Sequence, residues 1–250
     1  MDIFGHRGRV GSGWPVENTI AAVVAARADG ADGVEVDVRL SADGVPVCMH
    51  DRDLWRLAGH GVEVGSLSYA ALLRYPLPGG ESIARLDEVV EEVHGRDRLL
   101  LDLKGDGVPP GALAVAVVRI LRRVGAGEGG LDQGVMVSSF STEVLEAVRR
   151  VGPELRRALI TGAEVPAITA LSRALAVPGT DVHPHVQSVL ADHAVVDRAA
   201  EAGVAIRCWT VNRPVDARLL DMAGVAAVIT DDPGELRRAL ADCNRAARRR

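Results

Sequence analysis

The chain has 250 residues and a formal net charge of -5 at pH 7. This length fits one large domain, and the small negative charge offers no general attraction to nucleic acid or to an anionic membrane. Any phosphate-binding site must therefore be built locally. Hydrophobic residues make up 48% of the chain and charged residues 25%, which is ordinary for a soluble globular enzyme.

No targeting or membrane segment is visible in the sequence. The N-terminus lacks an apolar stretch preceded by basic residues, and no apolar run approaches the roughly 20 residues needed to cross a bilayer. The three cysteines are few, odd in number and far apart, so they indicate no disulfide framework. We expect a cytoplasmic protein with a small-molecule substrate, no nucleic-acid partner and no stable membrane insertion.

Short apolar runs alternate with longer stretches that have helical spacing. The predicted strands are residues 2–5, 33–38, 98–104, 134–139, 155–160, 174–183, 204–211 and 225–230. The predicted helices are residues 18–30, 85–95, 111–125, 142–152, 191–203 and 214–224. This rhythm predicts an α/β protein, a (β/α)8 TIM barrel forming a single domain over residues 1–250. An open doubly wound sheet is the alternative, although no Gly-x-Gly-x-x-Gly sequence follows a strand as in dinucleotide-binding sheets.

One segment breaks this rhythm after the second strand. Asp43 and Gly44 predict a tight turn, so residues 45–49 should return antiparallel as a short hairpin strand, without a crossover helix. Residues 52–85 are then an inserted loop region, with one short helix expected within residues 66–75. Insertions of this size at the catalytic end of a barrel commonly carry function.

Two strands are expected to bring carboxylates together. Side chains alternate along a strand, so Glu35 and Asp37 share one face, and Asp102 shares a face with Lys104 in the third strand. Carboxylates gathered on an inner face repel one another unless a cation or a proton lies between them. An oxygen-rich cluster suits a hard divalent ion such as Mg²⁺ or Ca²⁺. The alternative is an ion network in which Lys104 neutralises the carboxylates.

The remaining candidates lie where other strands end. His6 and Arg7 follow the first strand, at the end of a barrel where active sites form, and His50 ends the hairpin. Histidine can transfer protons near neutral pH, and arginine matches phosphate oxygens with a planar fork. Trp209, at the end of the seventh strand, is interpreted as an apolar wall for a substrate or as a packing residue.

In these motifs the chain resembles the glycerophosphodiester phosphodiesterase family of the barrel-fold phosphodiesterase superfamily. The resemblance spans nearly the whole chain, and it rests on the order and spacing of several motifs together. They are GHRG (5–8), PVENT (15–19), GVEVDVRLSADGVPVCMHD (33–51), LDLKG (101–105), SSFS (138–141), WTVN (209–212) and ITDDP (229–233).

The resemblance implies metal-dependent hydrolysis of glycerophosphodiesters to an alcohol and sn-glycerol 3-phosphate. It implies that His6 and His50 are the general acid–base pair and that Arg7 and Lys104 hold the phosphate. It also implies the ligands of one divalent cation, Mg²⁺ or Ca²⁺: Glu35, Asp37 and Asp102. The family commonly has Glu where this chain has Asp102, which shortens the reach of that side chain by one methylene group.

Two other functions remain open at this point. The same site could cleave lysophospholipids in the manner of lysophospholipase D, in which case the region 52–85 should present a wide apolar mouth for an acyl chain. The modest apolar content of this region favours small, soluble diesters. The other alternative is a non-catalytic phosphate-binding barrel, although such a protein is expected to lose a histidine or a carboxylate, and this chain keeps them all.

Overall fold

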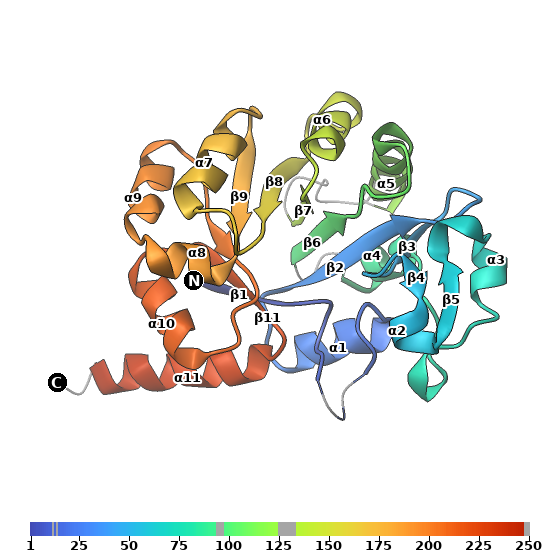
Figure 1. Ribbon diagram of the computed structural model, residues 1–250. Coiled ribbons are helices and arrows are strands. Elements are labelled where there is room, and N and C mark those ends of the chain that lie inside the picture. The colour runs from blue at the N-terminus through green and yellow to red at the C-terminus, as the bar shows by residue number, and fades with distance from the viewer. Residues whose placement is uncertain (12, 14, 94–97, 125–133, 248–250) are drawn as a thin grey trace.

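The computed structural model describes residues 1–11, 13, 15–93, 98–124 and 134–247, with side chains up to residue 241. A ring of parallel strands lies inside a layer of helices (Figure 1). The strands of the ring are β1 (Asp2–Gly5), β2 (Gly33–Leu40), β6 (Arg98–Leu103), β7 (Val135–Ser139), β8 (Arg156–Thr161), β9 (Thr180–Pro184), β10 (Arg207–Cys208) and β11 (Ala227–Thr230).

The surrounding helices begin soon after most of these strands. They are α1 (Ile20–Ala28), α4 (Leu86–Val93), α5 (Pro110–Val124), α6 (Thr142–Val151), α7 (Ala167–Leu175), α8 (Val186–Ala191), α9 (Ala194–Glu201), α10 (Pro214–Met222) and α11 (Pro233–Ala247). Hydroxyl side chains fix two of their starts, because Thr19 and Ser141 accept backbone hydrogen bonds as the N-caps of α1 and α6. Within the described residues, no helix combines the length and the apolar character that a membrane crossing requires.

The strand order is β10-β11-β1-β2-β6-β7-β8-β9, and the two ends of this path meet. Isolated parallel bridges join Val182 to Ile206 and His185 to Trp209. The Trp209 carbonyl accepts a hydrogen bond from the Val186 N–H at 2.8 Å. The predicted (β/α)8 TIM barrel is therefore confirmed, and the doubly wound alternative is wrong.

Alternation along the strands produces two apolar layers. Outward residues of β2 and β6, such as Val36 and Leu101, are fully buried against the helices. Inward residues form a second cluster at the centre of the barrel: Phe4, Leu100, Met136, Ala158, Ala227 and Ile229. Polar side chains further along the same strands therefore lie above a closed apolar floor.

The hairpin after β2 is present as predicted. Strand β3 (Pro46–Cys48) runs antiparallel to β2, with Val38 opposite Cys48 and Leu40 opposite Pro46. Gly44 adopts the left-handed φ of 79° that this turn requires. The N–H of Met49 donates to the Asp37 carbonyl at 3.0 Å, which places His50 beside the carboxyl end of β2.

Residues 52–85 form a compact excursion on one side of the barrel (Figure 1). Its elements are β4 (Asp53–Leu54), α2 (Trp55–Ala58), β5 (His60–Glu63), η1 (Val64–Ser66), α3 (Tyr69–Leu72) and η2 (Pro78–Gly80). Helix α3 is the short helix that the sequence predicts, with Ser68 as its N-cap. The apolar residues of the excursion pack with those of the hairpin in a separate cluster: Val47, Met49, Leu54, Val64, Leu72, Leu77 and Ile83.

The prediction for residues 174–183 is wrong in its first half. Ala174 and Leu175 end α7, because Ala167, Ala170, Leu171 and Ala174 recur at helical spacing on its buried face. Strand β9 begins only at Thr180, after a turn at Gly179. Helices α7 and α8 were not predicted. The strand predicted at 204–211 is shorter in the structure, where it spans only Arg207–Cys208. Residues 94–95 and 125, at the ends of two predicted helices, lie outside the described residues.

Gly33 permits the close contact between β1, β2 and β6. A Cβ atom at this position would lie 2.4 Å from the Arg98 carbonyl oxygen and 2.5 Å from the Phe4 ring. We expect Gly33→Ala to lower the free energy of unfolding by roughly 1–3 kcal/mol, because the barrel must shift to make room. Urea denaturation measures this change. Gly61→Ala is the matched control, since no atom lies within 4 Å of the added carbon, and equal stability of the two variants would contradict the prediction.

Candidate active site

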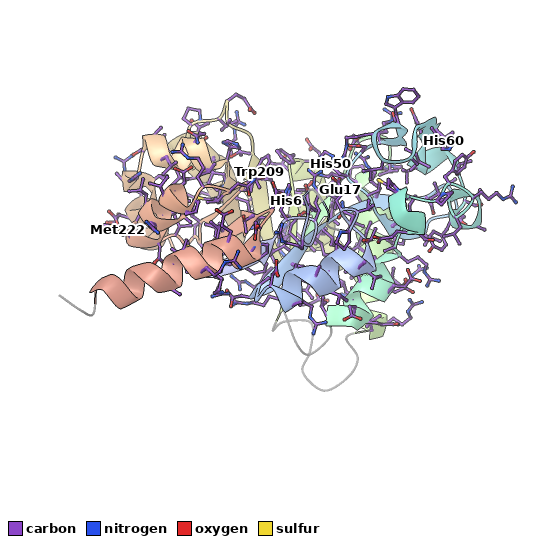
Figure 2. The ribbon with its side chains drawn as sticks, turned by 90° about the horizontal axis from the view of Figure 1, so that it is seen from below. His6, Glu17, His50, His60, Trp209 and Met222 are labelled. Atoms are coloured by element: carbon purple, nitrogen blue, oxygen red, sulfur yellow. The ribbon has the colours of Figure 1, made fainter. Side chains whose placement is uncertain are left out.

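The structure brings all eight residues singled out from the sequence into one cavity. The cavity opens at the carboxyl ends of the strands, and Figure 2 shows His6, His50 and Trp209 in the central part of the molecule. The predicted residues that line it are His6, Arg7, Glu35, Asp37, His50, Asp102, Lys104 and Trp209. Other lining residues are Ser138, Phe140, Ile160, His183 and Ile229.

Three carboxylates meet on the inner side of β2 and β6. Asp37 and Asp102 are register partners in the parallel ladder, and Glu35 lies one inward position before Asp37. One oxygen from each side chain lies within 4.8 Å of the others. All three side chains are buried, so their mutual repulsion is poorly screened by water.

Two permanent cations lie against these three negative charges. The Lys104 ammonium is 2.8 Å from Asp37 Oδ1 and also contacts Asp102 Oδ2. The Arg7 Nε lies 3.2 Å from Asp37 Oδ2, while the Arg7 backbone N–H donates to Glu35 Oε2 at 2.9 Å. The expected lysine–carboxylate network is thus present, but it leaves one negative charge uncompensated.

Burial and the neighbouring charges shift the pKa values of the three carboxyl groups in different directions. Burial raises the pKa of Glu35 to about 7, and the charge of Asp37 adds to the effect. Burial also raises the pKa of Asp102, although Lys104 opposes the shift. For Asp37, burial alone would raise the pKa, but Lys104 and Arg7 outweigh it and hold the pKa well below its usual range.

The donor set fits a hard divalent cation. Asp102 Oδ1 is buried and has no hydrogen-bond partner, which is costly for an acceptor unless another group satisfies it. Three convergent carboxylates offer only oxygen donors, as Mg²⁺ and Ca²⁺ prefer. The acidic triad Glu35, Asp37 and Asp102 can therefore hold such an ion together with the neighbouring cations.

His6 is fixed by the strand on the other side of β1. Its backbone N–H donates to the Thr230 carbonyl at 2.7 Å, and its Nδ1 lies 2.7 Å from Asp231 Oδ1. Because a carboxylate only accepts, Nδ1 carries the proton and Nε2 is the nitrogen available for proton transfer. Asn212 holds Asp231 in turn, donating to Oδ2 at 2.5 Å and accepting from the Asp231 N–H at 2.9 Å.

His50 has a corresponding carboxylate partner. Its Nδ1 lies 2.7 Å from Asp51 Oδ1, and Asp51 Oδ2 accepts a hydrogen bond from Arg56 Nε at 2.6 Å. The backbone carbonyl of His50 accepts from Arg39 Nε at 2.9 Å. Each of the two imidazoles is thus oriented through its Nδ1 by an acidic side chain.

The loop after β1 has an unusual backbone. Arg7 has a φ of 55° and Asn18 a φ of 62°, which non-glycine residues rarely adopt. Gly8 has a φ of 88°, and a Cβ there would lie 2.5 Å from the backbone of Ala22 in α1. This packing turns the Arg7 N–H toward Glu35, which explains why glycine follows the His-Arg pair.

Asn18 and Glu17 hold side chains that line the cavity. The Asn18 side chain makes two hydrogen bonds with Asp37, donating from Nδ2 to Oδ2 and accepting from the backbone N–H, both at 2.9 Å. Glu17 accepts from Arg7 at 2.9 Å and lies in the same central region as His6 and His50 (Figure 2).

An apolar wall faces the ionic side of the cavity. Trp209 packs edge-to-face against Phe140, with ring centroids 5.5 Å apart, and its indole N–H donates to the His183 carbonyl at 3.0 Å. Ile160 and Ile229 extend the wall. The charged groups of the cavity thus come from β2, β6 and the ends of β1 and β3, while apolar side chains from β8, β11 and the segments after β7 and β10 complete its lining.

Sequence reasoning gave no role to Asp51, Arg56, Asn212 or Asp231. Asp231 and Asn212 follow β11 and β10, so their position at the carboxyl ends of strands is a signal that could have found them. Arg56 has no such signal, because it belongs to the excursion and reaches the site only through tertiary contacts.

The fold is a parallel (β/α)8 barrel, and the carboxyl ends of its strands gather two oriented imidazoles, an arginine, a lysine and an acidic triad. These features define a barrel enzyme. Residues 6–235 match the model of the Glycerophosphoryl diester phosphodiesterase family. The chain belongs to this family and is therefore an enzyme of the phosphodiesterase class.

Individual relatives show the same relationship. A Mycobacterium tuberculosis protein named probable glycerophosphodiester phosphodiesterase 1 is 32% identical over 257 residues, covering 96% of this chain and 92% of that protein. A glycerophosphodiester phosphodiesterase of Caldanaerobacter subterraneus is 30% identical over 229 residues, covering 88% and 90%. An Oleispira antarctica phosphodiesterase, solved in complex with the product sn-glycerol-3-phosphate, superposes with a TM-score of 0.82 at 26% identity, covering 96% and 97%.

Removal of the Asp231 carboxylate should lower the pKa of His6. Burial alone would lower this pKa, but the hydrogen bond to Asp231 and the charge of Glu35 outweigh it and raise the pKa above its usual value. In Asp231→Asn the burial effect is less opposed, so the imidazole should lose its proton at lower pH than in the wild type. NMR titration of the ring protons measures the change. The exposed His60 serves as internal control, and an unchanged His6 titration would refute the prediction.

Proposed function

We propose that the protein hydrolyses glycerophosphodiesters to an alcohol and sn-glycerol 3-phosphate. The observation that carries this proposal is that two imidazoles, each oriented by a carboxylate at Nδ1, line the same cavity as Arg7, Lys104 and the acidic triad. The family supports it, as does the product bound to the Oleispira antarctica relative.

In this proposal His6 and His50 act as the general acid–base pair. One imidazole removes a proton from the attacking oxygen, and the other donates a proton to the leaving alcohol. Arg7 and Lys104 bind the negative oxygens of the phosphodiester, so that charge developing at phosphorus meets fixed positive groups in a partly dry site. Trp209 and Phe140 offer apolar surface to the carbon atoms of the substrate.

Glu35, Asp37 and Asp102 would hold one divalent cation, Mg²⁺ or Ca²⁺, and Asp102 Oδ1 is the acceptor that lacks another partner. When bound, such an ion neutralises phosphate oxygens and stabilises the charge that develops on them. Asn18 keeps Asp37 in place, and the Arg7 N–H does the same for Glu35.

Small diesters fit the site better than lysophospholipids. No residue of 52–85 lines the cavity that holds the eight predicted residues. The excursion buries most of its large apolar side chains in a cluster of its own, while Trp55 and Leu73 stay exposed. It therefore adds no apolar side chain to the cavity that could receive an acyl chain. A comparison of glycerophosphocholine with lysophosphatidylcholine tests this choice, and faster turnover of the lysophospholipid would favour the alternative.

His6→Ala and His50→Ala should each lower kcat on glycerophosphocholine by roughly 10²–10⁴-fold, because each removes a proton-transfer group. Choline release in a coupled assay measures the loss, and circular dichroism checks that the variants stay folded. His60→Ala is the matched control, since His60 is exposed in the excursion and packs against Tyr75. Wild-type turnover in either site variant would refute the assigned roles.

Treatment with EDTA should abolish turnover, and Mg²⁺ or Ca²⁺ added separately should restore it. Calorimetric affinity for the ion should weaken between about pH 8 and about pH 6, because Glu35, with a pKa of about 7, takes up a proton that competes with the ion. Asp102→Asn should weaken binding by at least roughly tenfold. Asp106→Asn, which alters an exposed partner of Arg39, is the control. Full activity in excess chelator would overturn the metal assignment.

A further inference from the structure

The excursion contacts the carboxylates around the active site through Arg56. Arg56 lies in α2, next to Leu54, which is fully buried in the apolar cluster of the excursion. Its guanidinium spans two carboxylates. Nε donates to Asp51 Oδ2 at 2.6 Å, while Nη1 and Nη2 donate to the two oxygens of Glu17 at 2.9 and 2.6 Å.

Each of these carboxylates holds a residue that faces the cavity. Asp51 orients His50 through Nδ1 at 2.7 Å, and Glu17 accepts from Arg7 at 2.9 Å. We call the ordered set His50, Asp51, Arg56, Glu17 and Arg7 the Arg56 bridge. It links His50, which follows the hairpin strand β3, to Arg7, which lies in the loop after β1.

The arrangement is more than a pair of surface contacts. An isolated exposed ion pair contributes little to stability, and the Arg56 side chain is 47% exposed. Glu17, however, is only 14% exposed, and its forked contact with Arg56 is the geometry in which arginine binds most strongly. Burial would raise the pKa of Asp51, but hydrogen bonds from Arg56 and His50 outweigh burial and lower it. Asp51 thus stays an acceptor for His50.

We propose that Arg56 is a positioning residue, which sets the orientation of His50 through Asp51 and that of Arg7 through Glu17. The excursion therefore contributes to catalysis without lining the cavity. This inference deepens the proposed function and rests on it for its kinetic consequences, whereas the structural consequence for the His50 ring can be measured without turnover.

The test compares Arg56→Gln with Arg52→Gln. Arg52 also belongs to the excursion and pairs with Glu63 at 3.1 Å, where both side chains are about half exposed and neither lines the catalytic cavity. We expect Arg56→Gln to lower kcat on glycerophosphocholine by roughly tenfold or more, and Arg52→Gln to stay within about twofold of the wild type. Arg56→Lys should recover only part of the loss, because an ammonium cannot fork across both carboxylates.

Two further measurements separate positioning from a general loss of stability. The double variant Asp51→Asn/Arg56→Gln should lose less than the product of the two single losses, because both changes act on the same imidazole. The ring nitrogen resonances of His50, observed by NMR, should move in Arg56→Gln and stay in place in Arg52→Gln.

The outcomes are distinct. If the wild type turns over no glycerophosphodiester, the proposed function fails, and the His50 resonances alone decide on Arg56. If the wild type is active but Arg56→Gln matches Arg52→Gln in kcat and in the His50 resonances, the positioning role is refuted. Multiplicative losses in the double variant would likewise refute action through Asp51.

Discussion

The structure depends on the burial of three carboxylates against two fixed cations. Glu35, Asp37 and Asp102 lie on neighbouring strands above an apolar floor, where water cannot screen their charge. Arg7 and Lys104 neutralise part of it, and the remainder makes the site receptive to a proton or a divalent cation. The same cations are those expected to meet a phosphodiester, so the electrostatics that keep the site folded also prepare it for an anionic substrate.

Much of the fold and of the candidate site could be predicted from the sequence, because strand alternation and chain order are local properties. The period of two along β2 places Glu35 and Asp37 inward, and the Asp43–Gly44 turn brings His50 back to the same end. The sequence pattern misses α7 and assigns its last two residues, Ala174 and Leu175, to a strand, because a short apolar run does not distinguish a helix from a buried strand. Nothing in the local pattern marks Arg56, whose contacts join residues 39 positions apart.

Both imidazoles are oriented by a carboxylate, but different parts of the structure hold the two carboxylates. Asp231, held by Asn212, orients His6, whereas Asp51, held by Arg56, orients His50. The first pair belongs entirely to the barrel. The second pair depends on the excursion, which lies outside the barrel, so the hairpin and the excursion together hold His50. His50 itself follows the hairpin strand β3, so the barrel strands and their helices alone supply only His6.

The ring closes between β9 and β10 through fewer backbone pairs than join β2 to β6. Those strands are joined by two isolated bridges, whereas β2 and β6 share a continuous six-residue ladder. Trp209 belongs to one of these bridges, and Asp37 and Asp102 face each other in the ladder. The spacing of these two acidic groups is thus fixed by continuous backbone pairing, whereas the place of the indole is set by one bridge, by backbone hydrogen bonds with Pro184 and Val186 and by the bond from its ring N–H to the His183 carbonyl.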